Sequence, residues 1–357
     1  MVGKLEPELM LRYIISRVGV LDSSVLVGPS IGEDAAIIDL GDGRVLVVHA
    51  DPITGAVEYL GWLAVHIPCN DIAVRGARPR WLLPVIYLPE GSSEDLVDRV
   101  TEQIDRAARE LEAAVVGGHT EFTPGISRPL ISMTAIGITG RSEYVATRGA
   151  RVGDLVLMTK SAGVEGTAIL STDFREVLQE LGVPQEIIER SSRFIERVSV
   201  VREALLLAEH RLVTSMHDPT EGGLIGGLAE IAYASGTTIY IRENAVRVAE
   251  ETETISRALG IDPLRLISSG ALVATTPPDK AEEALKTLGK EGIEASVIGT
   301  VDERSGDLVV VERRSGRIER VSEVYVEDEL FRLISTLPSR RPNPANPACG
   351  PSFNSIA

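Results

Sequence analysis

The sequence predicts an α/β protein with two domains, and three observations support this. The chain has 357 residues, more than the ~250 to 300 at which single hydrophobic cores stop growing. Apolar runs typical of strands alternate with helical spacing of apolar residues in both halves. A Gly153-Asp154 pair opens a new block near the middle. We therefore expect domains at residues 1–150 and 151–337, followed by a flexible, proline-rich tail at 338–357.

The first domain is expected to contain a βαβ-like unit. Apolar residues at helical spacing predict helices, and runs of branched residues between turns predict strands. Pro68 falls inside one helical segment, so that helix is expected to kink or restart there. The expected elements are helices at 5–18, 59–77 and 93–111, and strands at 35–40, 45–50, 82–88, 114–116 and 131–139.

The second domain is expected to form another α/β layer. A turn rich in glycine precedes one of its helices, and strands of five or six residues lie between the helical segments. The expected elements are strands at 155–159, 237–242, 271–275 and 295–300, helices at 165–172, 184–209, 224–235 and 279–291, and a turn at 217–223.

Composition excludes several classes of function. The net charge of −16 and the lack of a basic stripe with aromatic residues argue against nucleic acid as a partner. No apolar run approaches the ~18 to 20 residues that cross a bilayer, and the N-terminus lacks the apolar stretch of a signal peptide, so we expect a cytoplasmic protein without a membrane role. Cys69 and Cys349 form no disulfide framework, and Cys69 is expected to be an inert core thiol.

Acidic residues recur at predicted turns and strand ends. Each motif alone is typical of an ordinary surface turn. Together they favour a Mg²⁺ site, because Mg²⁺ binds in proteins through a few carboxylates and the phosphates of a substrate. The motifs are Gly32-Glu33-Asp34-Ala35, His49-Ala50-Asp51, Asn70-Asp71 and His217-Asp218-Pro219.

Two glycine-rich segments are candidate phosphate sites. Gly117-Gly118-His119-Thr120-Glu121 follows a predicted strand, and Asp218 to Leu224, with Gly222 and Gly223, precedes a helix. Glycines let backbone N–H groups approach an anion, and a helix N-terminus favours one. A plain turn and an ordinary helix cap are the alternatives. The sequence contains no P-loop, no dinucleotide fingerprint, no paired zinc histidines and no serine nucleophile elbow.

The order of these motifs over about residues 30 to 300 resembles one superfamily. Its members are aminoimidazole ribonucleotide synthetase, selenophosphate synthetase, thiamine monophosphate kinase and the hydrogenase maturation factor HypE. The resemblance implies a PurM-like fold, in which an N-terminal mixed sheet forms a barrel across a homodimer and a C-terminal α/β sandwich follows. The second half is most similar to HypE, through Met216-His217-Asp218-Pro219-Thr220 with Gly222-Gly223.

The resemblance also implies ligands and roles. ATP and Mg²⁺ are the implied cofactors, and phosphate-site roles fall on the carboxylate and glycine motifs. The implied metal ligands are Asp34, Asp51, Asp71 and Asp218. The implied nucleotide-binding residues are Asp34, Asp51, Asn70, Asp71, Gly117, Gly118, Thr120, Gly222 and Gly223. The candidate catalytic residues are His119, Glu121 and Asp218, where His119 either acts on a phosphate as an acid or base or is a turn histidine.

The implied reaction is phosphoryl transfer from ATP that activates a carbonyl or carboxamide oxygen. The acceptor would be a small molecule or a protein thiocarboxamide, and a maturation protein is a possible partner. A small-molecule kinase or cyclising synthetase, and a nucleotide-binding scaffold without turnover, remain alternatives. The chain departs from HypE beside the presumed acceptor: Glu121 stands where HypE has lysine, Glu221 where it has arginine, and Ser268-Ser269-Gly270 where it has Glu-Gly.

Overall fold

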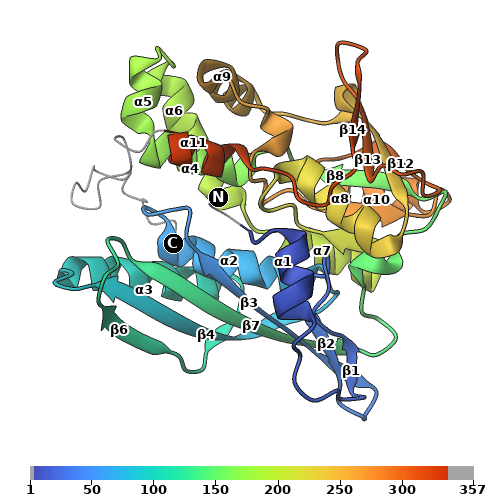
Figure 1. The fold of residues 1–357 in the computed structure, drawn as a ribbon, viewed down its shortest axis with the longest axis horizontal. Coiled ribbons are helices and arrows are strands. Elements are labelled where there is room, and N and C mark those ends of the chain that lie inside the picture. The colour runs from blue at the N-terminus through green and yellow to red at the C-terminus, as the bar shows by residue number, and fades with distance from the viewer. Residues whose placement is uncertain (1–3, 337–357) are drawn as a thin grey trace.

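The chain folds into two halves, each built on a seven-stranded sheet. A computed structural model describes residues 4–336, and Figure 1 shows the first sheet with its helices below the second. The predicted tail and Cys349 lie outside the described residues. The strands of the first sheet are β1 (Val25–Val27), β2 (Ala36–Asp39), β3 (Arg44–Ile53), β4 (Arg78–Pro89), β5 (Ala114–Val115), β6 (His119–Thr123) and β7 (Leu130–Gly140).

The first sheet is mixed, as the fold class predicts. Its order is β1-β2-β3-β7-β4-β5, with β6 also pairing with β4. Strand β7 is antiparallel to both β3 and β4, while β5 and β6 run parallel to β4. Residues along β4 and β7 alternate between buried and partly exposed, which is typical of a sheet with helices on one face.

Two helices cover one face of the first sheet. Helix α2 (Leu60–Ala73) is buried along its whole length and packs on β3 and β7. It runs through Pro68 as one helix, so the predicted restart does not occur. Helix α3 (Glu94–Glu110) packs on α2 and begins where the Ser93 hydroxyl accepts a hydrogen bond from the Leu96 amide at 3.3 Å.

The N-terminal segment differs from the predicted helix at 5–18. It forms a short helix α1 (Pro7–Met10) followed by a π-helical turn at Leu11–Ile15. The apolar residues that suggested an amphipathic helix stay largely exposed, with Ile14 57% exposed. No core therefore forms against that face, and packing rather than spacing decides the length of a helix.

The second sheet has the order β14-β13-β10-β12-β8-β11-β9. Only the β10–β13 pair is parallel among its described strands. The sequence analysis did not predict the two short strands at one edge of this sheet, β13 and β14, which have four residues each. The strands are β8 (Leu155–Thr159), β9 (Ser215–His217), β10 (Thr238–Arg242), β11 (Val273–Thr276), β12 (Ala295–Asp302), β13 (Val309–Glu312) and β14 (Ile318–Val321).

Helices cover both faces of the second sheet, which explains the continuous apolar run of β8. Val156 and Met158 belong to the core that contains α8, whereas Leu157 belongs to the core that also contains α2 and α4. The segment predicted as one helix at 184–209 is broken at 193–200. The helices are α4 (Val164–Asp173), α5 (Arg175–Glu180), α6 (Gln185–Ser192), α7 (Val201–Glu209), α8 (Gly223–Ser235), α9 (Glu250–Leu259), α10 (Ala281–Lys290) and α11 (Glu329–Thr336).

The two halves share a buried interface. Helix α2 of the first half contacts α7 of the second, and their apolar residues belong to one core. Cys69 on α2 is buried, and burial raises the pKa of its thiol, which fits the predicted inert role. Among residues 4–336, no helix combines the length and the apolar character needed to cross a membrane.

Candidate active site

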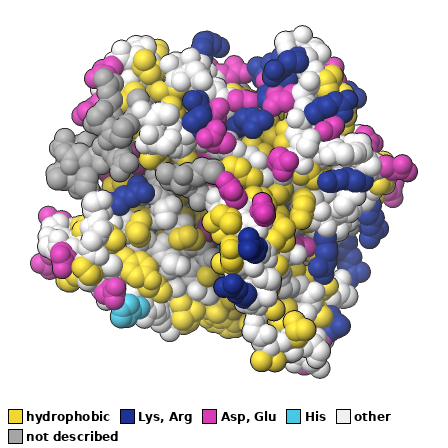
Figure 2. All heavy atoms as spheres, viewed as in Figure 1, with side chains coloured by type: hydrophobic (Ala, Val, Ile, Leu, Met, Phe, Trp, Pro, Cys, Tyr) yellow, Lys and Arg dark blue, Asp and Glu magenta, His cyan; other side chains and the backbone are white. Residues whose placement is uncertain are grey.

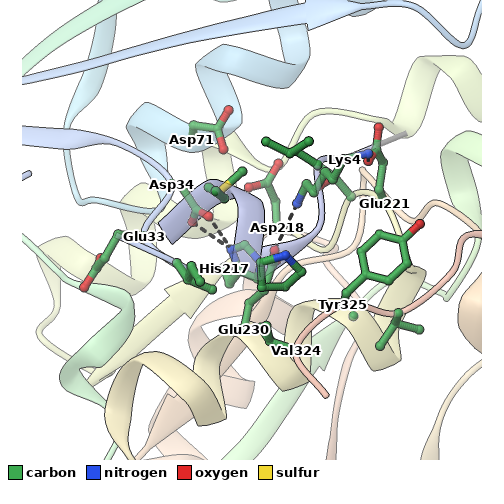
Figure 3. Close-up of a pocket in the computed structure, with 18 of the residues that line it drawn as sticks. Lys4, Glu33, Asp34, Asp71, His217, Asp218, Glu221, Glu230, Val324 and Tyr325 are labelled. Atoms are coloured by element: carbon green, nitrogen blue, oxygen red, sulfur yellow. Dashed lines mark hydrogen bonds and ion pairs between the residues drawn. The ribbon is translucent and has the colours of Figure 1, made fainter. Parts of the chain in front are cut away.

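Four aspartates from both halves line one cavity of about 260 Å³. Asp34 precedes β2, Asp51 lies on β3, Asp71 lies on α2, and Asp218 follows β9. Figure 3 shows Asp34, Asp71 and Asp218 converging on the space beside Lys4. The structure thus brings together the four residues that the sequence singled out as metal ligands.

The ligand atoms of the cavity form two close groups. Asp34, His217 and Asp218 offer atoms within 4.8 Å of one another, and so do His49, Asp51 and Asp71. Carboxylate oxygens at this spacing suit a divalent cation that also binds phosphate. Both oxygens of Asp218 are buried and make no hydrogen bond to a described residue. These orphaned oxygens fit a bound cation, because a buried charged group otherwise lacks compensation.

Burial, together with repulsion from neighbouring carboxylates, raises the pKa of three of the aspartates. Burial, and then the charges of Asp34 and Asp51, raise the pKa of Asp71 well above its usual value. Burial, and then the charges of Asp71 and Asp34, do the same to the pKa of Asp218. Burial also raises the pKa of Asp51. A divalent cation would relieve this repulsion and let the carboxylates ionise.

Asp34 differs, because two cations hold it. Burial would raise its pKa, but the charges of His217 and Arg75 lower the pKa of the Asp34 carboxyl below its usual value. His217 Nδ1 lies 2.7 Å from Asp34 Oδ1, and Arg75 donates to Asp34 Oδ2 at 2.8 Å. Asp34 therefore stays ionised and fixed in place before any ligand binds.

His217 forms ion pairs with two buried carboxylates. Burial would lower its pKa, but Asp34 and Glu230 raise the pKa of His217 to about 10. Its Nδ1 faces Asp34, and its Nε2 lies 2.7 Å from Glu230. Both ring nitrogens carry protons in an imidazolium, so neither can bind a metal. Glu230 in turn contacts Lys4 Nζ at 3.0 Å, which closes the chain of charges seen in Figure 3.

Arg75 joins the two halves from the end of α2. Its side chain is fully buried and donates to Glu33 at 3.1 Å and Asp34 at 2.8 Å. It also donates to the Thr147 hydroxyl at 2.7 Å and the Met216 carbonyl at 2.6 Å. The Glu33 carboxylate therefore pairs with Arg75, and Figure 3 shows it directed away from His217 and Asp218.

Gly32 sets the distance between the first acidic motif and α8. Its φ is +83°, and a Cβ there would lie 2.6 Å from the Glu230 carbonyl oxygen. Only glycine fits without a shift of backbone. The glycine of the Gly-Glu-Asp motif is thus required by packing between the halves.

The segment 117–121 lies outside the cavity that the four aspartates line. Gly117, Gly118, His119, Thr120 and Glu121 are exposed at the edge of the first sheet and do not line the cavity. His119 Nε2 lies 3.2 Å from Glu121 Oε2, and a Cβ at Gly118 would lie 2.2 Å from the Pro84 carbonyl oxygen. Within one chain, the structure does not bring these predicted nucleotide-binding and catalytic residues to the aspartates.

Three further predicted residues make structural contacts. Asn70 donates to the Val198 carbonyl at 2.9 Å and accepts from the Val200 amide at 2.8 Å, so its amide faces the start of α7. Gly222 donates its backbone N–H to Asp328 at 2.9 Å, and a Cβ at Gly223 would lie 2.6 Å from the Leu266 carbonyl oxygen. These contacts explain the residues by packing, and none of the three lines the cavity.

The sequence analysis missed Lys4, Arg75 and Glu230 at this site. Each acts through partners far along the chain, as with Lys4 and Glu230, which are 226 residues apart. The pattern of residues along α8 contains one signal that could have identified Glu230. A charged residue on an otherwise apolar helix face, such as Glu230 on α8, is costly to bury and therefore requires a partner.

Both halves of the chain are similar to known proteins. The model of the AIR synthase related protein N-terminal domain matches residues 32–139, and that of the C-terminal domain matches residues 151–312. The carbamoyl dehydratase HypE of Azotobacter vinelandii is 32% identical over 279 residues, which cover 75% of this chain and 78% of that protein. The chain belongs to the AIR synthase related family. Within this family it lies in the HypE-like branch.

Two solved structures extend the comparison to the fold. The hydrogenase maturation protein HypE in complex with ATP is 30% identical, with a TM-score of 0.66, over 83% of this chain and 90% of that chain. A structure of a HypE–HypF complex is 27% identical, with a TM-score of 0.65, over 82% of this chain and 94% of that chain. The two-domain PurM-like fold expected from the AIR synthase related motifs is confirmed.

Proposed function

We propose that this chain is an ATP-dependent enzyme that activates the oxygen of a carboxamide and removes it, as a carbamoyl dehydratase of the HypE type. One observation carries the proposal: four aspartates from both halves converge on a single cavity in a chain similar to HypE solved with ATP. Carboxylates in such a cleft are what an ATP-using enzyme needs to hold the metal that accompanies the phosphates.

Mg²⁺ is the proposed companion of ATP. Asp34, Asp51, Asp71 and Asp218 would hold it, and it would supply neutralisation of charge on the phosphates during transfer. The chain's own residues orient the metal ligands and the nucleotide. Arg75 and His217 fix Asp34, and the enclosing walls position the nucleotide, so that little reorganisation is needed when phosphoryl transfer begins.

A homodimer is the proposed assembly. Helices α2 and α3 cover one face of the first sheet, while the opposite face carries apolar residues such as Leu83, Val48 and Ile136 that are only partly buried. Figure 2 shows hydrophobic side chains gathered in the lower half of the view, where this sheet lies. A second copy covering this face would give the predicted barrel. It is also the route by which the segment 117–121 could approach a cavity.

A maturation protein is the proposed second partner. The support is the solved complex of HypE with HypF, a chain of similar fold. The acceptor would be a carboxamide on a small molecule or on a protein, and a partner protein would deliver the second kind. Pull-down of the purified chain with a HypF from the same source tests this partner. If neither pull-down nor cross-linking detects a complex, the proposed partnership is contradicted.

The test of nucleotide binding is calorimetric titration with a non-hydrolysable ATP analogue, with and without Mg²⁺. We expect binding that depends on Mg²⁺ and that weakens by at least ~10-fold in Asp71→Asn, because one metal ligand loses its charge. Asp95→Asn, on the exposed side of α3, is the matched control and should bind as the wild type does. No binding by the folded wild type would refute the proposal.

Turnover separates the proposal from its alternatives. ADP release that depends on a carbamoyl compound supports the dehydratase. ADP release with thiamine monophosphate or a purine precursor would instead indicate the small-molecule kinase or cyclising synthetase. Binding without ADP release from any acceptor would indicate the nucleotide-binding scaffold.

A further inference from the structure

A second cavity, of about 320 Å³, adjoins the first. Five residues line both cavities: Lys4, Asp51, Thr220, Glu221 and Phe331. The remaining walls come from the end of β3 and the loop after it, from α2 and α4, from the loop before β11, and from α11, and they are mainly apolar. A molecule in the second cavity would therefore lie next to a nucleotide whose metal is held by Asp51.

Two buried polar groups in this cavity, Glu165 and Ser269, lie near each other and keep hydrogen-bonding capacity that no other described residue satisfies. Glu165, in the first turn of α4, is 4% exposed, and its Oε2 makes no hydrogen bond to a described residue. Ser269 is fully buried, and its Oγ likewise has no hydrogen bond within residues 4–336. Buried polar groups almost always find a partner, so two unpaired groups lining one cavity indicate a ligand that supplies the missing bonds.

The backbone holds both groups rigidly. Ser268 Oγ accepts from the Gly163 amide at 2.8 Å, and the Gly166 amide donates to the Ile267 carbonyl at 3.0 Å. The loop that carries Ser269 is thereby tied to the start of the helix that carries Glu165. Their separation is set before a ligand arrives, which is what precise contact with a small group requires.

The charges of the second cavity select against an anionic acceptor. Asp51, Glu165 and Glu221 line it, and Lys4 is the one cation among its described lining residues. The Lys4 ammonium already pairs with Glu230, and the backbone N–H of Lys4 donates to Glu221. A phosphorylated acceptor would need free cations or amides in place of these carboxyl groups. The cavity suits an uncharged group that can donate hydrogen bonds, as a primary amide does.

We propose that Glu165 is a catalytic residue that binds the carboxamide of the acceptor through its nitrogen and removes a proton from it, with Ser269 bonding the same group. This inference rests on the proposed function and assigns a residue to its acceptor side. The carboxamide oxygen bonds to the γ-phosphorus of ATP, and the bond from that phosphorus to the bridging oxygen breaks to release ADP. The nitrogen passes one proton to the Glu165 carboxylate.

In the second stage of the reaction, the phosphorylated carboxamide loses its phosphate. The carbon–oxygen bond breaks, the second proton of the nitrogen leaves with the phosphate as hydrogen phosphate, and a nitrile remains. Burial raises the pKa of Glu165 to about 8, with the nearby hydroxyl of Ser269 opposing the rise and the charges of Asp328, Asp51 and Asp218 adding to it. A carboxyl group with a pKa near neutrality can both accept and return a proton.

The experiment compares the full-length wild type with Glu165→Gln, Ser269→Ala and the control Glu176→Gln, an exposed position on α5. The probe is S-carbamoyl-N-acetylcysteine methyl ester, an uncharged carbamoyl compound, given with Mg-ATP. ADP release and nitrile formation are measured beside the affinity for the non-hydrolysable analogue. We expect Glu165→Gln to lose at least ~100-fold in turnover with unchanged affinity for the analogue, Ser269→Ala to lose less, and the control to lose nothing.

A stability measurement excludes a merely structural role. Because the pKa of Glu165 is higher in the folded chain than its ordinary 4.5, the carboxyl group costs stability as pH rises above that value. Glu165→Gln should therefore melt above the wild type at pH 7 while losing turnover. A lower melting temperature in Glu165→Gln would contradict the unpaired state of the carboxyl.

Failures of the two proposals are distinguishable. A wild type that does not bind the analogue refutes the proposed function. Analogue binding with full turnover in Glu165→Gln refutes the role of Glu165 alone. Turnover of thiamine monophosphate by the wild type, or no turnover of the carbamoyl probe by a wild type that binds the analogue, overturns the assignment of an uncharged carboxamide to the second cavity.

Discussion

His217 and Asp34 form a buried ion pair across the two halves of the chain, with Nδ1 of the histidine 2.7 Å from Oδ1 of the aspartate. The same ring contacts Glu230 through Nε2, also at 2.7 Å. One imidazolium thus compensates two carboxylates beside the cavity, and its charge is needed for both.

The first prediction concerns His217 and pH. Its folded pKa of about 10 lies above the ordinary 6.5, so its contribution to stability is fully present below pH 6.5 and is lost as pH rises through about 10. His217→Gln should lower the free energy of unfolding at pH 6 by roughly 3 to 5 kcal/mol, because two buried carboxylates lose their partner.

Urea denaturation from pH 6 to pH 10 is the measurement. The wild-type midpoint should fall over this interval much more steeply than that of His217→Gln. His210→Gln, at an exposed position, is the matched control and should follow the wild type. Parallel curves for wild type and His217→Gln would show that the ring is not charged in the fold.

The second prediction concerns Arg75. Arg75→Met removes the donor to Glu33 and Asp34 and should reduce the free energy of unfolding by roughly 3 to 5 kcal/mol, because the carboxylates remain buried. The free energy of unfolding of Arg75→Lys should lie between those of the wild type and Arg75→Met, since an ammonium cannot donate to four acceptors in fixed directions. Denaturant titration checks the order, and Arg109→Gln on the surface of α3 should leave the midpoint unchanged. Equal midpoints for wild type and Arg75→Met would contradict it.

The third prediction separates stability from metal binding at Asp218. In metal-free buffer at pH 7, Asp218→Asn should raise the free energy of unfolding by about 1 to 3 kcal/mol, because it removes an unpaired buried carboxyl. Added Mg²⁺ should raise the melting temperature of the wild type and not that of the variant. Differential scanning fluorimetry with EDTA and with Mg²⁺ measures both effects. A Mg²⁺ response that survives in Asp218→Asn would remove Asp218 from the ligand set.

The fourth prediction concerns assembly. Val48 and Ile136 are direct cross-strand neighbours on the partly exposed face of the first sheet. Ile136→Asp places a charge at the centre of that face and should convert a dimer into a monomer. Light scattering after size exclusion gives the mass, and Thr101→Asp on the outside of α3 is the control. A wild type of monomeric mass, or a dimer that tolerates Ile136→Asp, would place the interface elsewhere.

The sequence alone located the four aspartates because each lies in or next to a segment whose periodicity is clear. Asp51 closes a run of strand residues and Asp71 lies in a long apolar helix, so both positions could be predicted to within a residue. Lys4, Arg75 and Glu230 could not, because their roles exist only through contacts between distant segments, such as the 141 residues between Arg75 and Met216. Local patterns carry no information about such pairs.

The glycine-rich segments were visible in the sequence, but the reason for their glycines was not. Gly117-Gly118 and Gly222-Gly223 were predicted as phosphate sites, yet a Cβ at Gly118 or Gly223 would collide with the Pro84 or Leu266 carbonyl oxygen. Glycine is required in both places for packing, whether or not a phosphate binds. A sequence cannot distinguish a glycine that admits a ligand from one that admits a neighbouring backbone.

Gly32 gives this packing a consequence for how the protein can work. The two halves touch there with no side chain between them, directly beside Asp34 and Glu230. Any displacement of one half against the other at this contact would therefore also disturb the ion pairs that His217 forms with Asp34 and Glu230.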